Sequence, residues 1–160
     1  MNNIENKSFR AAYQAALKLL ALKDRTRKEI TEKLKRKGFS SDLANQVVSQ
    51  LEEEGLVNDC KVSQTYFNEL WNYSNAGPTK ILNKSKEKGL DQEFIKAMIN
   101  NLTEEELKTK VKNIIKKRMK QGDNKAKLRI YRYLLNQGFS YSLINRAFAE
   151  LGYNLTNQQE

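Results

Sequence analysis

The stretch RTRKEITEKLKRKGFS, residues 25–40, decides the fold, because its pattern returns twice later in the chain. Its Gly38 aligns with Gly89 and Gly138, which follow at intervals of 51 and 49 residues. An isoleucine stands eight positions before each glycine; the three are Ile30, Ile81 and Ile130. A period of this size is typical of an array of structural units, each of which buries its apolar face partly against its neighbours. The sequence therefore predicts three tandem repeats.

Local signals inside each repeat predict helices. Thr26 followed by Glu29 is a capping-box pattern, in which side chains bond the free backbone N–H groups at a helix start. Thr103 and Glu106 repeat it. Gly38 predicts a helix end, because glycine adopts the left-handed conformation at low cost. Apolar residues at three- and four-residue spacing predict a helix over about residues 8–22, and breaks are expected at Gly122 and Asp123.

Nine helices in three triplets follow from these signals, and no alternating strand pattern competes with them. The fold class is therefore all-α, built of three tandem three-helix repeats. We expect the repeats at residues 8–57, 58–102 and 103–152, with flexible termini at 1–7 and 153–160.

The middle repeat differs from the other two at one core position. Ser85 stands where the first and third repeats have Leu34 and Leu134. We expect the middle repeat to lose a large core side chain there, with Leu82 as a partial replacement.

Composition excludes several classes of protein. The 160 residues are 39% hydrophobic and contain no apolar run long enough for a membrane span. The chain has no histidine and one cysteine, Cys60, so a Cys/His zinc site and an internal disulfide are excluded. No glycine-rich phosphate loop is present, and the commonest general base is missing. We expect a cytoplasmic protein that is not an enzyme, without cofactors or metals and without a membrane partner.

Positive charge is concentrated at two places. Residues 1–40 and 103–140 each have a net charge of +7, whereas residues 41–102 have −3. Such a chain is attracted to polyanions, although charge runs on short helices also form solvated faces. The candidates for a basic contact face are Lys28, Lys35, Arg36, Lys116, Lys117, Arg118, Arg129 and Arg132.

A second candidate surface is apolar. Leu128 and Leu135 in the third repeat stand where the first has Lys28 and Lys35. With Tyr131, they either pack against a neighbouring helix or form an apolar face for a partner protein. Tyr131, Tyr133 and Tyr141 also lie near basic residues and are candidates for partner contact.

A cluster of aromatic residues in the middle repeat could likewise either pack inside the protein or contact a partner. Tyr66, Phe67, Trp71 and Tyr73 crowd one predicted helix. Exposed aromatic side chains can stack on nucleobases, but two apolar stripes on a central helix that packs on two repeats explain this cluster more simply.

Four segments together resemble the RecX family of bacterial regulatory proteins. RTRKEITEKLKRKGFS with LEEEGLVNDCKVSQTYFNE is similar to the family's first repeat and junction. GPTKILNKSKEKGLDQEFI is similar to its second repeat, and YRYLLNQGFSYSLINRAF to its C-terminal repeat. The resemblance covers about residues 10–152, with departures at Ser85 and at Cys60-Lys61-Val62.

The resemblance implies a curved, elongated array of three-helix units. It also implies binding to the RecA recombinase filament on single-stranded DNA, along the filament's helical groove, with restraint of recombination, ATPase and coprotease activity. We expect the protein to be a monomer with at most weak direct contact with DNA. The alternative is a nucleic-acid-binding helical-repeat protein that acts without a recombinase, because three-helix units resemble helix-turn-helix modules.

Overall fold

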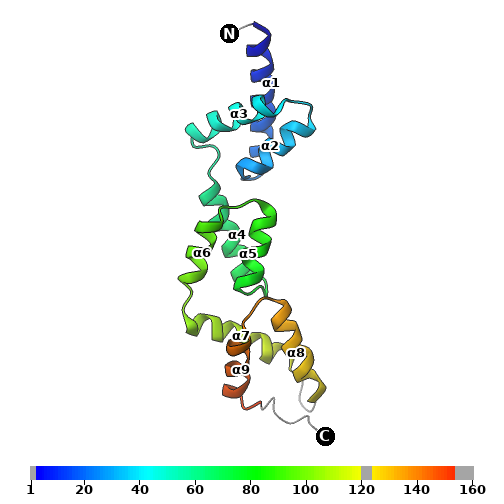
Figure 1. Cartoon of the computed structure of the whole chain (residues 1–160), viewed down its shortest axis with the longest axis vertical. Helices are drawn as coiled ribbons and strands as arrows, with labels where there is room; N and C mark the ends of the chain where they lie inside the picture. The colour runs from blue at the N-terminus through cyan, green and yellow to red at the C-terminus, as the bar shows by residue number, and fades with distance from the viewer. Residues whose placement is uncertain (1–2, 120–123, 154–160) are drawn as a thin grey trace. The chain divides into compact units, whose positions relative to one another are not determined.

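The computed structural model describes residues 3–119 and 124–153, which form nine helices with no strand among them (Figure 1). The helices are α1 (Asn3–Leu20), α2 (Arg27–Arg36), α3 (Ser41–Glu53), α4 (Asp59–Tyr73), α5 (Pro78–Lys88), α6 (Gln92–Asn100), α7 (Glu104–Arg118), α8 (Asn124–Asn136) and α9 (Tyr141–Glu150). The all-α fold class is confirmed. The predicted break at Gly122 and Asp123, and positions 1–2 and 154–160 of the predicted flexible termini, lie outside the described residues.

The first helix is longer than the sequence predicted. Helix α1 begins at Asn3 instead of residue 8, because residues 3–7 contain no glycine or proline that would stop a helix. It ends at Leu20, two residues earlier than predicted, and the chain then turns toward the N-cap of α2 at Thr26. Residues 3–7, expected in a flexible terminus, are therefore helical.

The predicted capping boxes and the glycines that follow the helices are confirmed. The N–H of Thr26 donates to Glu29 Oε2 at 3.1 Å, and the N–H of Glu29 donates to Thr26 Oγ1 at 3.1 Å. Thr103 and Glu106 form the second capping box at the start of α7. Gly38, Gly89 and Gly138 follow α2, α5 and α8 with φ of 91°, 74° and 87°, values that favour glycine.

The chain divides into two compact units. The first unit comprises Met1–Tyr66 and Ser85–Asp91, and the second comprises Phe67–Lys84 and Gln92–Glu160. Helices α4 and α5 thus contribute residues to both units, so the compact units do not coincide with the three sequence repeats, whose boundaries remain a prediction.

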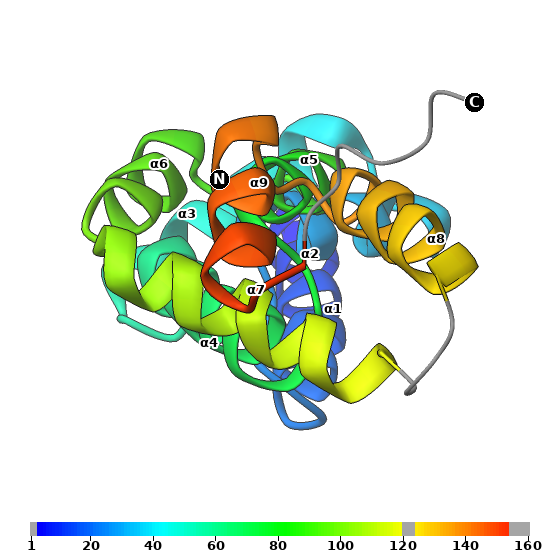
Figure 2. The same ribbon diagram turned by 90° about the horizontal axis from the view of Figure 1, so that it is seen from below.

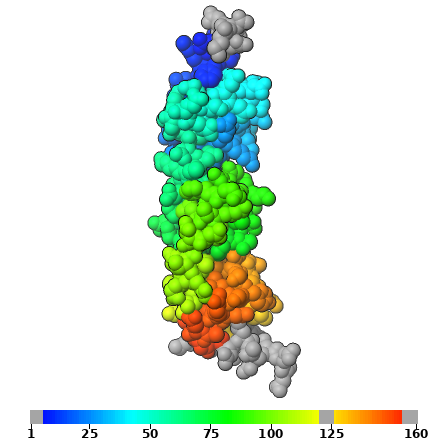
Figure 3. Space-filling view, turned by 60° about the vertical axis from the view of Figure 1, so that its left-hand side comes forward, coloured from blue at the N-terminus to red at the C-terminus, as the bar shows by residue number. Residues whose placement is uncertain are grey.

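Each unit has its own apolar core. In the first unit α1, α2 and α3 pack together, and their side chains form the blue and cyan part of the space-filling view (Figure 3). Its core consists of Ala12, Ala16, Ile30, Leu34, Ala44, Val47, Val48, Leu51 and Val57. In the second unit α8 and α9 both pack against α7 (Figure 2). This second core includes Val111, Ile115, Leu134, Ile144 and Phe148.

Serine occupies two buried positions among the helices α4 and α5. Ser63 and Ser85 are both 0% exposed, and neither hydroxyl has a hydrogen-bond partner among the described residues. The expected loss of a large core side chain at position 85 is therefore confirmed, and Leu82 is half-buried nearby in sequence. An unpaired buried hydroxyl costs free energy, so this part of the chain is packed less favourably than the two cores.

Candidate binding surfaces and the cavity between helices α4 and α7

All eight residues of the predicted basic face are exposed. Lys28, Lys35 and Arg36 lie on α2 in the first unit. Lys35 and Arg36 occupy the last turn of that helix, where positive charge interacts favourably with the helix dipole. Lys28 also contributes to packing, because the methylene stem of its side chain contacts Gly89.

The other five cations lie in the second unit. Lys116, Lys117 and Arg118 form the last turn of α7, and Arg129 and Arg132 lie on α8. Within the described part of the chain, Lys116, Lys117 and Arg132 have no ion-pair partner. Their charges are therefore available to an anion. Lys120 of the same sequence cluster lies outside the described residues.

Arg118 is held in place by an aromatic ring. Its guanidinium carbon lies 3.6 Å from the ring centroid of Tyr133 on α8. The hydroxyl of Tyr133 in turn accepts a hydrogen bond of 2.8 Å from Asn75 Nδ2. Stacking on the flat face leaves the N–H groups at the edge of the guanidinium free to bind a carboxylate or phosphate.

The predicted apolar face needs correction. Tyr131 is only 8% exposed and packs in the core of the second unit, with its ring 5.3 Å from that of Tyr141 and 6.1 Å from that of Phe148. Burial, together with a hydrogen bond to Tyr141, raises the pKa of Tyr131 to about 12. Leu135 is half-buried against the same core, so only Leu128, at 48% exposed, faces solvent. Packing against neighbouring helices therefore explains Tyr131 and Leu135.

The aromatic cluster of α4 also differs from its prediction. Phe67 is buried and Trp71 is half-buried, as expected for residues that pack inside the protein. Tyr73 belongs to the cluster that two apolar stripes were expected to explain, but its side chain is 89% exposed. Tyr73 is the last residue of α4, and the chain leaves the helix there before a neighbouring helix can cover the ring.

An open pocket of about 620 Å³ lies between the C-terminal end of α4 and helix α7, within the second unit. We call it the α4–α7 cavity. It is lined by Trp71, Asn72, Ser74, Asn75, Thr103, Glu105, Glu106, Thr109, Lys110, Asn113, Ile114, Lys117 and Arg118.

Lys110 on α7 connects the two sides of this cavity by hydrogen bonds to the end of α4. Its ammonium donates hydrogen bonds to the carbonyl oxygens of Trp71 and Ser74, the latter at 2.9 Å. It also lies 4.3 Å from the Trp71 ring centroid. These carbonyls lack helical partners at the end of α4, so the lysine caps that end. Burial lowers the pKa of Lys110 to about 8.

Sequence reasoning missed this cavity, although one signal for it was present. Lys110 follows Leu107 by three positions and precedes Ile114 by four, which places a lysine on the apolar side of its helix. A charge at such a position needs a specific partner, and the carbonyl groups of α4 are that partner.

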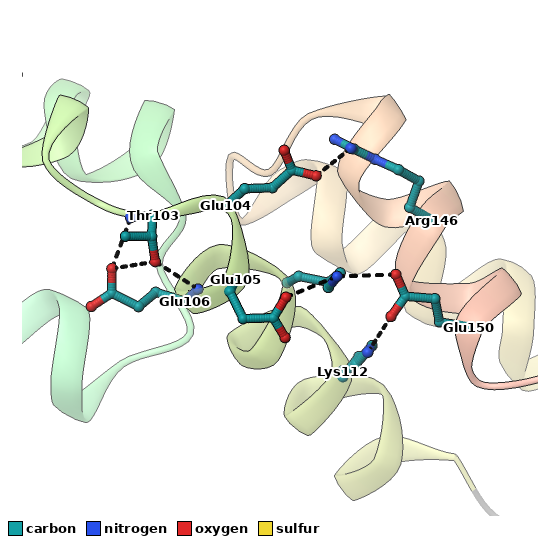
Figure 4. Close-up of polar contacts among 8 residues, drawn as sticks. Thr103, Glu104, Glu105, Glu106, Lys112, Arg146 and Glu150 are labelled. Atoms are coloured by element: carbon teal, nitrogen blue, oxygen red, sulfur yellow. Dashed lines mark hydrogen bonds and ion pairs between the residues drawn. The ribbon is translucent and has the colours of Figure 1, made fainter.

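Ion pairs fasten α7 to α9 beside the second core (Figure 4). Lys108 Nζ lies 2.9 Å from Glu105 and 3.1 Å from Glu150, and Glu150 also pairs with Lys112. Hydrogen bonds from Lys112 and Lys108 lower the pKa of the Glu150 carboxyl below its ordinary value. Glu104 pairs with Arg146, one turn before Glu150 on α9, so these charges are largely satisfied within the unit.

The described residues contain no group of three or more acidic, histidine or cysteine side chains that could hold a metal ion. None of the helices in the described ranges combines the length and the apolar character that a bilayer crossing requires. Cys60 is exposed and not in a disulfide.

The sequence and the structure are similar to those of one family. Residues 12–51 match the family model described as RecX, first three-helix domain. The Regulatory protein RecX of Finegoldia magna is 30% identical over 142 residues, which are 84% of this chain and 69% of that protein. The chain belongs to the RecX family. The predicted resemblance is thereby confirmed, and the family is one of regulatory proteins.

Further RecX proteins agree in sequence and in fold. The Regulatory protein RecX of Streptococcus pneumoniae is 30% identical over 85% of this chain, and the chain spans 54% of that relative's length. The crystal structure of RecX from Lactobacillus salivarius matches with a TM-score of 0.81 and 25% identity, over 92% of this chain and 98% of the other. A second crystal structure, of a regulatory protein RecX, has a TM-score of 0.81 at 21% identity and shows the same fold.

Proposed function

We propose that this protein binds the filament that the RecA recombinase forms on single-stranded DNA, and that it inhibits recombination, ATPase and coprotease activity. The proposal rests on membership of the RecX family, whose members are named regulatory proteins, and on the recombinase partner that the sequence resemblance implies. The observation that carries it in the structure is the set of exposed cations at the end of α2 and at the end of α7.

The mechanism that we propose is steric. A filament presents a long repeating groove, and a chain of helical units contacts it at several points. Linked contacts that are weak alone reinforce one another, because each raises the effective concentration of the next. Lys35 and Arg36 engage acidic patches or phosphates at one point, and Lys116 and Lys117 do so at another. The bound protein then blocks access to the groove and biases the filament toward an inactive form.

The experiment is an assay of RecA ATPase on single-stranded DNA, with filament length measured in parallel as the protein is added. We expect ATPase activity and filament length to fall. The variant Lys116→Glu/Lys117→Glu should require about tenfold more protein for the same effect, because two exposed attractions become repulsions.

Lys84→Glu/Lys86→Glu is the matched control. Both lysines are exposed on α5, and the pair changes the net charge by the same amount. ATPase activity and filament length that do not change when the native protein is added would refute the function. Equal losses in the two double variants would refute the role of α7.

A further inference from the structure

The α4–α7 cavity contains polar side chains that the fold does not use. The amide groups of Asn72 and Asn113 and the hydroxyl of Thr109 line it. None of the three forms a side-chain hydrogen bond with another described residue. All three side chains are exposed, so their donors and acceptors are available to a ligand, in an open pocket whose volume of about 620 Å³ is in the range of small-ligand sites.

Trp71 gives the cavity an aromatic wall. Its indole is half-buried, and the cation of Lys110 holds the ring from one direction. An indole fixed in this way is a surface on which a nucleobase can stack, and such stacking does not depend on base identity.

Positive charge lies further along α7, in its last turn. Arg118 is fixed by its stack on Tyr133, and Lys117 precedes it in the last turn of α7. Neither side chain has an ion-pair partner in the described ranges. With Lys116 they outweigh the partial negative charge of the helix C-terminus, and a stacked guanidinium can bind a phosphate through two parallel hydrogen bonds.

The carboxylates of the cavity are already engaged. Glu105 pairs with Lys108 at 2.9 Å, and Glu106 accepts hydrogen bonds from the N–H and hydroxyl of Thr103 at 2.7 and 2.8 Å. Their repulsion of an anion is thereby reduced, while Lys117 and Arg118 keep their full charge.

We propose that the α4–α7 cavity binds one nucleotide of a single-stranded nucleic acid, with the base against Trp71 and the amides of Asn72 and Asn113, and the phosphate at Lys117 and Arg118. An acidic peptide would bind Lys117 and Arg118 equally well, but its carboxylates would not stack on the Trp71 indole. The inference requires no recombinase, so it can fail while the proposed function stands, and the reverse also holds.

Trp71 is the single tryptophan of the chain, so its fluorescence reports on this cavity alone. The experiment titrates a short oligo(dT) into the full-length protein at low salt and follows Trp71 emission. We expect saturable quenching. Arg118→Gln/Lys117→Gln should weaken binding by about tenfold or more, because charge-assisted hydrogen bonds are lost. Arg118→Lys should show a smaller loss, since it keeps the charge but not the paired donors.

Three controls separate the alternatives. Lys84→Gln/Lys86→Gln removes the same charge from α5 and should leave the affinity for oligo(dT) within about twofold of the native value. An abasic oligonucleotide of equal length should bind more weakly and should not quench Trp71. Far-UV circular dichroism checks that each variant keeps its helix content.

Two results would overturn the proposal. The first is native affinity for oligo(dT) in the folded Arg118→Gln/Lys117→Gln variant, or an equal loss in the α5 control. The second is quenching by a poly-glutamate peptide at the same concentrations as oligo(dT), which would assign the cavity to an acidic protein segment.

Discussion

Gly89 lies against the side chain of Lys28, so closely that a Cβ at position 89 would collide with Cδ of that lysine. An equivalent contact occurs one repeat later, where a Cβ on Gly138 would lie 2.5 Å from the backbone nitrogen of Lys80. Gly38 has no such neighbour within 4 Å. The three aligned glycines therefore share one backbone conformation but carry different packing constraints.

Alanine substitutions at these glycines should form a graded series in the free energy of unfolding. Gly38→Ala should cost about 1 kcal/mol, because only the left-handed backbone is penalised. Gly89→Ala should cost slightly more, since the flexible lysine stem can move aside. Gly138→Ala should cost about 3 kcal/mol, because the backbone of Lys80 cannot move as easily. Urea denaturation measures all three, and equal losses would show that the packing contacts contribute nothing.

Removing a buried hydroxyl should stabilise the protein. Ser85 is 0% exposed and its hydroxyl has no partner in the described structure. Ser85→Ala should raise the free energy of unfolding by about 1 kcal/mol, because an unsatisfied polar group leaves the core. Ser142→Ala, at an exposed position of α9, is the control and should change it by less than about 0.5 kcal/mol. A loss of stability in Ser85→Ala would indicate that the hydroxyl is bonded in solution.

Truncation to alanine should change the free energy of unfolding much more at Tyr131 than at Leu128. Tyr131→Ala removes a ring from the core of the second unit and should cost about 3 kcal/mol. Leu128→Ala removes an exposed side chain and should change stability by less than about 0.5 kcal/mol. Urea midpoints distinguish the two. A nearly neutral Tyr131→Ala would restore the prediction of an apolar partner face at that residue.

The Glu150 ion pairs should make stability depend on pH in the acid range. The pKa of Glu150 is lowered from its ordinary value of 4.5 in the folded protein, first by Lys112 and then by Lys108. The unfolded chain therefore binds the proton more readily, and the stabilisation is present above pH 4.5 and is lost as the pH falls through the lowered pKa.

Glu150→Gln should accordingly lower the midpoint of thermal unfolding at neutral pH, and the difference from the native protein should shrink as the solution is acidified. Glu69→Gln, on an exposed part of α4, serves as the charge-matched control. A difference that stays constant from neutral pH to below pH 4 would refute this account of the ion pairs.

The fold could be predicted from sequence because its signals are local. Capping boxes at Thr26 and Thr103 and the glycine at position 38 act within one helical turn, and the structure has each of them. The isoleucines that recur with the repeat, Ile30, Ile81 and Ile130, are all buried.

The candidate surfaces could not be predicted with the same success, because exposure depends on the neighbouring helices. Tyr131 and Leu128 stand three positions apart on α8, yet the core covers one and not the other. The α4–α7 cavity depends on Lys110 reaching the carbonyl oxygens of Trp71 and Ser74, residues more than thirty positions away in the chain. No periodicity within one helix contains that information.

The two unpartnered serines have a consequence for motion. Ser63 on α4 and Ser85 on α5 contribute little apolar packing. Opening these helices therefore loses less stabilising free energy than opening α2 or α7, whose apolar faces lie in continuous cores. Local opening then requires less free energy, and amide hydrogens exchange with solvent deuterium in proportion to that opening. We expect the amides of α4 and α5 around these serines to exchange before those of Ile30 and Ile115. The protein would then open locally at α4 and α5 while α2 and α7 stay folded.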